Sequence, residues 1–294
     1  SSVKALNKTL IFTAASPKTL NAIWQYDLEK HNLKLLQSSL SVDIDPSYLS
    51  VPETIDFLTT NKQDAFGLYY NPKNKDFTMP DNEKPPLIVR SHGGPSTHTP
   101  LALDLEVQFW TSRGFAVLDV NYGGSTGYGR QYRQRLKGNW GIVDVDDCVN
   151  GALHLVKNKQ ADSKRLIIKG RSAGGFTTLA ALTFKKVFAC GASYYGISDL
   201  EAMTNHTHKF ESYYLEGLVG AYPEKKNRYI KHSPIHHMKN FSFPIILFQG
   251  GKDKVVPKIQ SEMIFNSLKK RNIPVAYVYF KEEAHGFRIA KNIQ

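Results

Sequence analysis

Residues 166–176 read LIIKGRSAGGF, and this stretch decides the fold. A short apolar run rich in β-branched residues leads into a G-x-S-x-G pentapeptide, and an apolar helical pattern follows over residues 176–182. A nucleophile elbow requires this context of strand, sharp turn and helix. Gly170 and Gly174 allow the close packing that such a turn needs. The pattern therefore predicts that Ser172 is a nucleophile at the end of a strand, beside the N–H groups of a helix N-terminus.

The composition is typical of a globular protein. The chain has 294 residues, 41% of them apolar, which suits one large α/β domain or two small ones. It has no apolar run long enough to span a bilayer (about 18 residues) and no apolar signal core at its start. We therefore expect no membrane span and a cytoplasmic location. The two cysteines, Cys148 and Cys190, argue against a disulfide framework.

The net charge is +12, from 38 basic and 26 acidic residues. A charge of this size requires a nucleic-acid function to be considered. The densest basic clusters, residues 130–135 and 269–271, are short and far apart in the sequence, and no nucleic-acid-binding motif accompanies them. The charge therefore favours a solvated basic surface and no nucleic-acid partner.

The first 50 residues differ in pattern from the rest. Residues 1–50 contain three strand-like runs separated by turn residues, at 9–14, 22–27 and 33–36. Short connections of this kind predict an antiparallel β meander. Three such strands are too few to bury a core of their own, so we expect them to pack on another part of the protein.

Residues 51–294 alternate short apolar strands with helical patterns. Besides the elbow strand and helix, the predicted strands lie at 54–59, 65–70, 87–91, 115–120, 187–195, 244–249 and 275–280, and the predicted helices at 105–110, 143–156 and 258–270. We expect a Gly-rich loop over 121–129 and irregular structure over 198–240. The alternation predicts the α/β class, with a mostly parallel sheet and helices on both faces.

A serine nucleophile needs a general base, and the base needs a carboxylate that orients it. In the α/β-hydrolase fold these partners follow the nucleophile in the order Ser, acid, His. Asp253 follows the strand at 244–249, and His285 follows the strand at 275–280. Both loops leave the carboxyl ends of strands, at the edge of the sheet where the elbow lies. We therefore predict an α/β-hydrolase with a catalytic triad of Ser172, Asp253 and His285.

An oxyanion hole needs two N–H donors, one of them from the residue after the nucleophile, which is Ala173. The second donor is expected in the motif HGGP at residues 92–95, which follows an early strand. Its glycines let the backbone approach a substrate carbonyl. We favour the N–H of Gly94 over that of Gly93.

Two residues offer alternative catalytic roles. Ser125 lies in a second G-x-S-x-G match, GGSTG at 123–127, directly after a strand. No apolar helix follows it, which argues against a nucleophile there. Asp199, which follows the strand ending at residue 195, is the second choice for the acid.

Two pairs of histidines, His206 with His208 and His236 with His237, are each close in sequence. No carboxylate or cysteine accompanies them at the spacing of a strong metal motif. We therefore predict no metal site.

Five motifs, in order along the chain, carry a family resemblance: HGGP at 92–95, NYGGSTGYG at 121–129, GRSAGG at 170–175, GKDKVVP at 251–257 and AHGF at 284–287. They resemble the catalytic domain of the prolyl oligopeptidase family, above all its acylaminoacyl-peptidase and dipeptidyl-peptidase branch. The resemblance covers about residues 51–290. It implies a serine peptidase that cleaves peptide bonds of short peptides through an acyl-enzyme, without a cofactor.

The resemblance also implies a domain division. Family members carry a β-propeller before the hydrolase domain, so residues 1–50 are expected to be a remnant of its last blade. Residues 51–294 are then the α/β-hydrolase catalytic domain, without the long closing helix of the family.

Five side chains next to motif residues are expected to line an apolar substrate pocket: Phe176, Tyr194, Tyr195, Val256 and Tyr122. Two other functions stay open for the same residues. One is a carboxylesterase of the same fold, and the other is an inactive truncated fragment that acts in assembly. A homo-oligomer is compatible with each of them.

Overall fold

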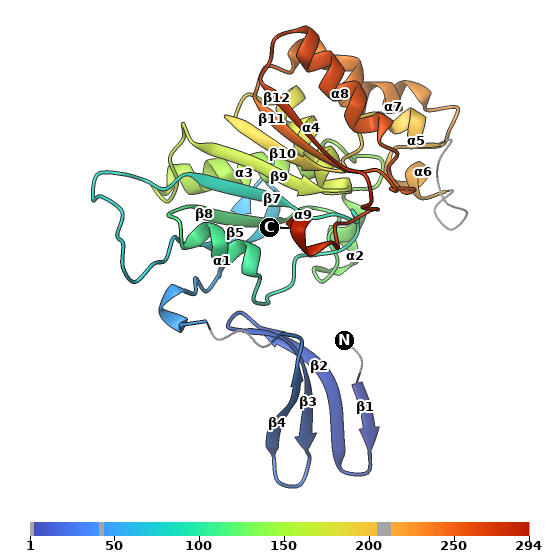
Figure 1. Ribbon diagram of the computed structural model, residues 1–294. Coiled ribbons are helices and arrows are strands. Elements are labelled where there is room, and N and C mark those ends of the chain that lie inside the picture. The colour runs from blue at the N-terminus through green and yellow to red at the C-terminus, as the bar shows by residue number, and fades with distance from the viewer. Residues whose placement is uncertain (1–2, 41–43, 205–212, 294) are drawn as a thin grey trace.

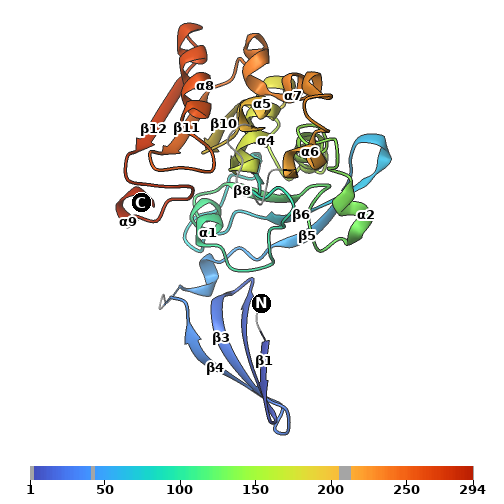
Figure 2. The ribbon, with the colours of Figure 1, turned by 90° about the vertical axis from the view of Figure 1, so that its right-hand side faces the viewer.

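The computed structural model describes residues 3–40, 44–204 and 213–293. The described residues form a large sheet surrounded by helices, and a separate small sheet that extends away from this body (Figures 1 and 2). The small sheet contacts the larger body at Leu103, in the loop before α1 (Leu105–Thr111). The Leu103 N–H donates a hydrogen bond to the Ser16 carbonyl (2.8 Å).

The small sheet is an antiparallel meander in the order β1-β2-β3-β4, as predicted for residues 1–50. Its strands are β1 (Val3–Leu6), β2 (Thr9–Ser16), β3 (Thr19–Asp27) and β4 (Asn32–Ser38). The sequence analysis missed β1. All four of its side chains are exposed, so it lacks the alternation of apolar and polar residues that marks a half-buried strand.

The large sheet has eight strands in the order β12-β11-β10-β9-β7-β8-β6-β5. The strands are β5 (Glu53–Leu58), β6 (Asp64–Tyr70), β7 (Leu87–Ser91), β8 (Ala116–Asn121), β9 (Leu166–Arg171), β10 (Cys190–Tyr194), β11 (Ile245–Gly250) and β12 (Val275–Phe280). β5, β6 and β8 pair antiparallel, and every other pair is parallel. This confirms the predicted mostly parallel sheet, with the elbow strand β9 near its middle.

The helices lie on both faces of this sheet, as predicted. They are α1 (Leu105–Thr111), α2 (Gly129–Gln134), α3 (Val143–Lys157), α4 (Ala173–Phe184), α5 (Leu200–Thr204), α6 (Tyr214–Leu218), α7 (Lys226–His232), α8 (Ile259–Lys270) and α9 (Ala290–Ile293), with 3₁₀ turns at Pro46–Tyr48, Thr60–Lys62 and Pro234–Asn240. None of the described helices is long and apolar enough to cross a bilayer.

The core has two layers, because successive side chains of a strand point to opposite faces. In β7, Leu87 and Val89 join the main cluster, which the side chains of α3, α4 and α8 complete. Ile88 points the other way, into a smaller cluster with Val107 and the partly buried Trp110 of α1. The main cluster therefore lies beneath the elbow helix α4, which gives the nucleophile a rigid support.

Part of the predicted loop structure is helical. The region 198–240, expected to be irregular, contains α5, α6, α7 and a 3₁₀ turn, and α2 follows the Gly-rich loop. These helices have only five to seven residues. Two turns or fewer are too short for a 3.6-residue apolar periodicity to be recognised in a sequence.

Candidate active site

Ser172 lies at a sharp turn between β9 and α4, with φ 55° and ψ −120°. A positive φ at a non-glycine residue is strained, and it persists only where the surroundings fix it. Two close approaches of backbone fix it here. A Cβ on Gly170 would lie 2.2 Å from the Gly174 carbonyl oxygen, and a Cβ on Gly174 would lie 2.0 Å from that of Ser91. Only glycine fits at either position.

The structure brings Ser172, His285 and Asp253 together. The Ser172 hydroxyl donates a hydrogen bond to Nε2 of His285 (2.9 Å), and Nδ1–H of His285 donates to Oδ2 of Asp253 (2.8 Å). The Asp253 side chain is fully buried, whereas 23% of the His285 side chain is exposed. Because a carboxylate only accepts, the proton of the neutral imidazole is on Nδ1 and leaves Nε2 free to accept the serine proton.

The loop after β11 fixes the Asp253 carboxylate. Its Oδ1 accepts the N–H groups of Val255 and Val256, both at 2.9 Å. One oxygen is thus held by the backbone of its own loop, and the other is left for His285. The imidazole therefore bonds to Oδ2 of Asp253 and not to Oδ1.

A second carboxylate closes the loop that carries His285. Glu283 is 2% exposed, and its Oε2 accepts the N–H of Arg288 (2.9 Å). Its Oε1 accepts the N–H of Ile289 (2.9 Å) and Nδ2 of Asn292 (2.8 Å). The Glu283 backbone oxygen also accepts the N–H of Lys252 (2.8 Å), next to the catalytic acid candidate. Glu283 therefore joins the acid loop to both ends of the histidine loop.

Replacing Glu283 by glutamine should lower kcat by about 10- to 10²-fold, because small misplacements of a reacting group have costs of this order. The amide nitrogen of glutamine would face the backbone N–H of Arg288 or of Ile289, and two donors cannot bond to each other. Kinetics would measure kcat, and the low-field proton NMR signal of the His285 Nδ1–H should broaden. Glu282→Gln is the matched control, since the neighbouring Glu282 is exposed and pairs with Lys252. Equal kcat in both variants would contradict this role.

Glu283 also predicts an acid limit. Burial disfavours its charged form, but the hydrogen bonds from Asn292, Arg288 and Ile289 hold its pKa below the ordinary 4.5. Because the pKa is lowered, the stabilisation from the ionised Glu283 carboxylate is fully present above about pH 4.5. It is lost as the pH falls through the lowered pKa.

Several backbone N–H groups near Ser172 have no partner. Among the described residues, the N–H groups of Gly93, Gly94 and Ala173 donate no hydrogen bond. Ala173 opens α4, where the first N–H groups of a helix lack intrahelical acceptors. The backbone of Gly93 lies against the elbow, since a Cβ there would be 3.7 Å from Cβ of Ser172. These groups are the predicted oxyanion donors.

The expected pocket residues separate into two groups. Phe176 and Tyr122 are 0% exposed and Val256 is 1% exposed, so these side chains support the site from below and present no surface to a substrate. Tyr195 is also buried, at 7% exposed, but its ring lies 4.7 Å from the His285 ring, beside the reacting groups. Tyr194 stacks on Phe248 with ring centroids 4.4 Å apart, and keeps a partly exposed surface. The pocket prediction therefore stays only for the two tyrosines.

The alternative candidates lie elsewhere. Ser125 is 0% exposed and bonds to Nε2 of His92 (2.8 Å), so it is not a surface nucleophile. Asp199 accepts the N–H groups of Glu201 and Ala202 at the start of α5 (2.9 and 3.1 Å), which is a helix-capping role.

Of the histidines considered for a metal site, His206 and His208 lie outside the described residues. His236 and His237 lie in the 3₁₀ turn Pro234–Asn240. Across the part of the chain that the structure describes, no three histidine, cysteine or carboxylate side chains gather closely enough to hold a metal ion.

The elbow strand also carries charges that the sequence analysis did not interpret. Lys169, which is buried, forms an ion pair with Glu106 of α1, and Arg171 bonds to the same carboxylate (2.9 Å). Burial alone would raise the pKa of Glu106, but the charge of Lys169 holds it below its ordinary value. Glu106 therefore fixes α1 against the strand that ends in Ser172. Lys169 and Arg171 stand two residues apart in β9, a spacing that places both side chains on one face of the strand.

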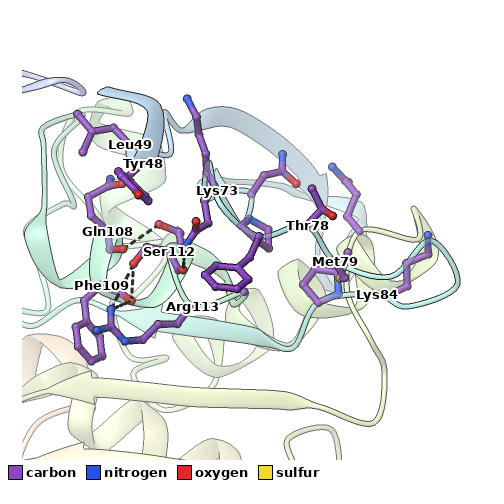
Figure 3. Close-up of a pocket in the computed structure, with 18 of the residues that line it drawn as sticks. Tyr48, Leu49, Lys73, Thr78, Met79, Lys84, Gln108, Phe109, Ser112 and Arg113 are labelled. Atoms are coloured by element: carbon purple, nitrogen blue, oxygen red, sulfur yellow. Dashed lines mark hydrogen bonds between the residues drawn. The ribbon is translucent and has the colours of Figure 1, made fainter. Parts of the chain in front are cut away.

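A large cavity lies at the opposite edge of the sheet, where the parallel strands begin (Figure 3). Its volume is about 1250 Å³, and Tyr48, Lys73, Met79 and Phe109 are among its lining residues. Arg113 lies over the Phe109 ring, 3.7 Å from its centroid. No member of the Ser172 site lines this cavity, so it has no part in the chemistry considered below.

The strand order and the serine elbow define the α/β-hydrolase class. Residues 101–294 match the prolyl oligopeptidase family, and the chain belongs to that family. Dipeptidyl aminopeptidase BIII of Pseudoxanthomonas mexicana is 29% identical over 252 residues, which are 84% of this chain and 34% of that protein.

Solved structures show the same similarity. A puromycin-hydrolysing peptidase of Mycobacterium tuberculosis aligns with a TM-score of 0.97 and 40% identity, over 99% of this chain and 44% of that one. An acylaminoacyl peptidase of Pyrococcus horikoshii aligns with a TM-score of 0.83 and 27% identity, over 97% of this chain and 45% of that one. The chain spans less than half the length of each of these three proteins.

Proposed function

We propose that this chain is the catalytic part of a serine peptidase that acts on short peptides through an acyl-enzyme. The observation that carries the proposal is the continuous hydrogen-bonded row from Ser172 through His285 to Asp253, beside the N–H groups of Gly94 and Ala173, which donate to no described residue. A serine hydroxyl is a weak nucleophile near neutral pH, and this row supplies the base that activates it.

The proposed reaction has two halves. Ser172 Oγ attacks the scissile carbonyl carbon while its proton passes to Nε2 of His285, and Asp253 stabilises the imidazolium that forms. The N–H groups of Ala173 and Gly94 hold the developing oxyanion, and one such donor contributes about 3–4 kcal/mol. The C–N bond then breaks as His285 returns the proton to the leaving amine. Water activated by His285 hydrolyses the acyl-enzyme and frees Ser172.

We propose a domain division at residue 50. Residues 1–50 form the remnant of the last blade of a β-propeller, and residues 51–294 the catalytic domain. The four antiparallel strands of the small sheet, which pair only with one another among the described strands, support the division. We propose a cytoplasmic location. The proposed substrates are short peptides, and no nucleic-acid partner is proposed.

A substrate comparison tests the proposed activity. Matched p-nitroanilides of one dipeptide, with free or acetylated N-terminus, would be assayed beside the corresponding p-nitrophenyl ester. Relatives named as dipeptidyl aminopeptidases and as acylaminoacyl peptidases suggest these two amide classes. Turnover of either anilide supports a peptidase. Turnover of the ester alone would overturn the peptidase assignment in favour of a carboxylesterase.

A further inference from the structure

His92 joins the oxyanion loop to the second G-x-S-x-G segment. Its Nδ1 lies 2.7 Å from the Gly93 carbonyl oxygen, and its Nε2 lies 2.8 Å from Ser125 Oγ. A carbonyl oxygen only accepts, so the proton is on Nδ1. Burial lowers the pKa of His92 to about 4, so the ring is neutral near pH 7 and Nε2 accepts the Ser125 hydroxyl proton. One tautomer satisfies both contacts.

The bond to Gly93 determines where the next N–H points. The Gly93 carbonyl and the Gly94 N–H belong to one planar trans peptide, so they point in opposite directions. A carbonyl held by His92 therefore fixes the direction of the Gly94 N–H. Gly94 has φ +117°, a conformation that favours glycine and lets the chain turn there.

Further contacts from the same segment hold the loop. The Tyr122 hydroxyl donates to the carbonyls of His92 (3.1 Å) and Pro95 (3.2 Å). The Tyr122 ring stacks on the His92 ring, with centroids 4.2 Å apart and planes 16° apart. The Ser125 N–H in turn donates to the Tyr122 carbonyl (2.9 Å). Because Tyr122 and Ser125 are both fully buried, their positions are set by the core.

We propose that His92 is a positioning residue of the oxyanion hole, which, with Ser125 bonded to its Nε2, aims the Gly94 N–H at the substrate carbonyl. The proposal rests on the proposed function, because it concerns the same site. It also gives the second G-x-S-x-G motif a role: its serine orients a donor and does not attack a substrate.

Two isosteric variants separate the roles of the ring nitrogens. Asparagine at position 92 places an N–H donor near the position of Nδ1, whereas glutamine reaches the position of Nε2 and loses the bond to Gly93. His92→Gln should lower kcat by about 10²-fold with little change in KM. His92→Asn should keep most of kcat, and Ser125→Ala should lower it less than His92→Gln does.

His98→Asn is the matched control. His98 is an exposed histidine of the same loop, and its Nδ1 lies 2.9 Å from Thr126 Oγ1, so it makes a similar contact without touching the glycines. It should leave kcat unchanged.

The decisive measurement titrates a bound oxyanion. A peptidyl trifluoromethyl ketone, ¹³C-labelled at its carbonyl, forms a hemiketal: Ser172 Oγ bonds to the ketone carbon, the carbonyl oxygen becomes the oxyanion, and the proton goes to His285. ¹³C NMR then reports the hemiketal pKa. This pKa should rise in His92→Gln and stay near the wild-type value in His92→Asn and His98→Asn, since a general structural defect would not follow this order.

¹⁵N NMR of the histidine-labelled full chain tests the tautomer without any activity. The signals absent in His92→Asn belong to His92, and they should show a protonated Nδ1 and an unprotonated Nε2. A proton on Nε2 of His92 would overturn the inference. The same hemiketal pKa in His92→Gln and in the wild type would also overturn it. A folded wild type that forms no hemiketal contradicts the proposed function, and the tautomer measurement still decides the inference in that case.

Discussion

Replacing Ser172 by alanine should lower kcat about 10⁶-fold, the effect typical of removing a serine nucleophile. The hydroxyl is the only group of this residue that reaches Nε2 of His285, at 2.9 Å. The variant should fold normally, because alanine keeps the Cβ that the elbow already accommodates. A fluorophosphonate probe, which labels only an activated serine, should label the wild type and not the variant.

Ser112→Ala is the matched control for this result. Ser112 follows α1 at the opposite edge of the sheet. Its hydroxyl donates to the Phe109 carbonyl (3.2 Å) and accepts from Nη1 of Arg113 (3.4 Å). Its replacement should change neither labelling nor kcat. Labelling that survives in Ser172→Ala and disappears in Ser125→Ala would contradict the assignment of the nucleophile.

Replacing Asp253 by asparagine should lower kcat about 10⁴-fold near pH 7. The N–H groups of Val255 and Val256 both point at Oδ1, so the amide oxygen of asparagine will occupy that side. The amide nitrogen then faces His285 and donates to Nδ1. The imidazole proton moves to Nε2, where it blocks acceptance of the Ser172 proton. Steady-state kinetics should show this loss in kcat with a nearly intact KM.

Asp199→Asn is the comparison for the acid, since Asp199 follows the neighbouring strand β10 and caps α5. Asparagine caps helices nearly as well as aspartate, so stability and kcat should both stay close to the wild type. A larger loss of kcat in Asp199→Asn than in Asp253→Asn would reverse the two assignments.

The sequence predicted the sheet because strand, loop and helix each left a local signal. Asp253 and His285 could be placed beside Ser172 because each follows an apolar run, and parallel strands bring their carboxyl ends to one edge. Glu283 left no such signal. Its partners are two backbone N–H groups and the Asn292 amide, whose positions depend on how the chain turns after His285, and no residue pattern encodes that turn.

The pocket prediction had a different weakness. Phe176, Tyr122 and Val256 were chosen because they adjoin motif residues, but adjacency does not give the direction of a side chain. Phe176 lies in α4 and packs on Trp140, with ring centroids 4.5 Å apart, inside the main cluster. The role of His92 was likewise hidden, because it depends on contact with a serine 33 positions away.

The site is shared between the middle and the margin of the large sheet. Ser172 follows β9, which pairs on both sides, whereas His285 follows β12, which among the described strands pairs with β11 alone. An end strand can detach with a smaller free-energy change than the whole sheet. When it does, the base leaves while the nucleophile stays in place. Heating should therefore abolish turnover before the fold melts, and the temperature limit of the enzyme is that of its outermost strand.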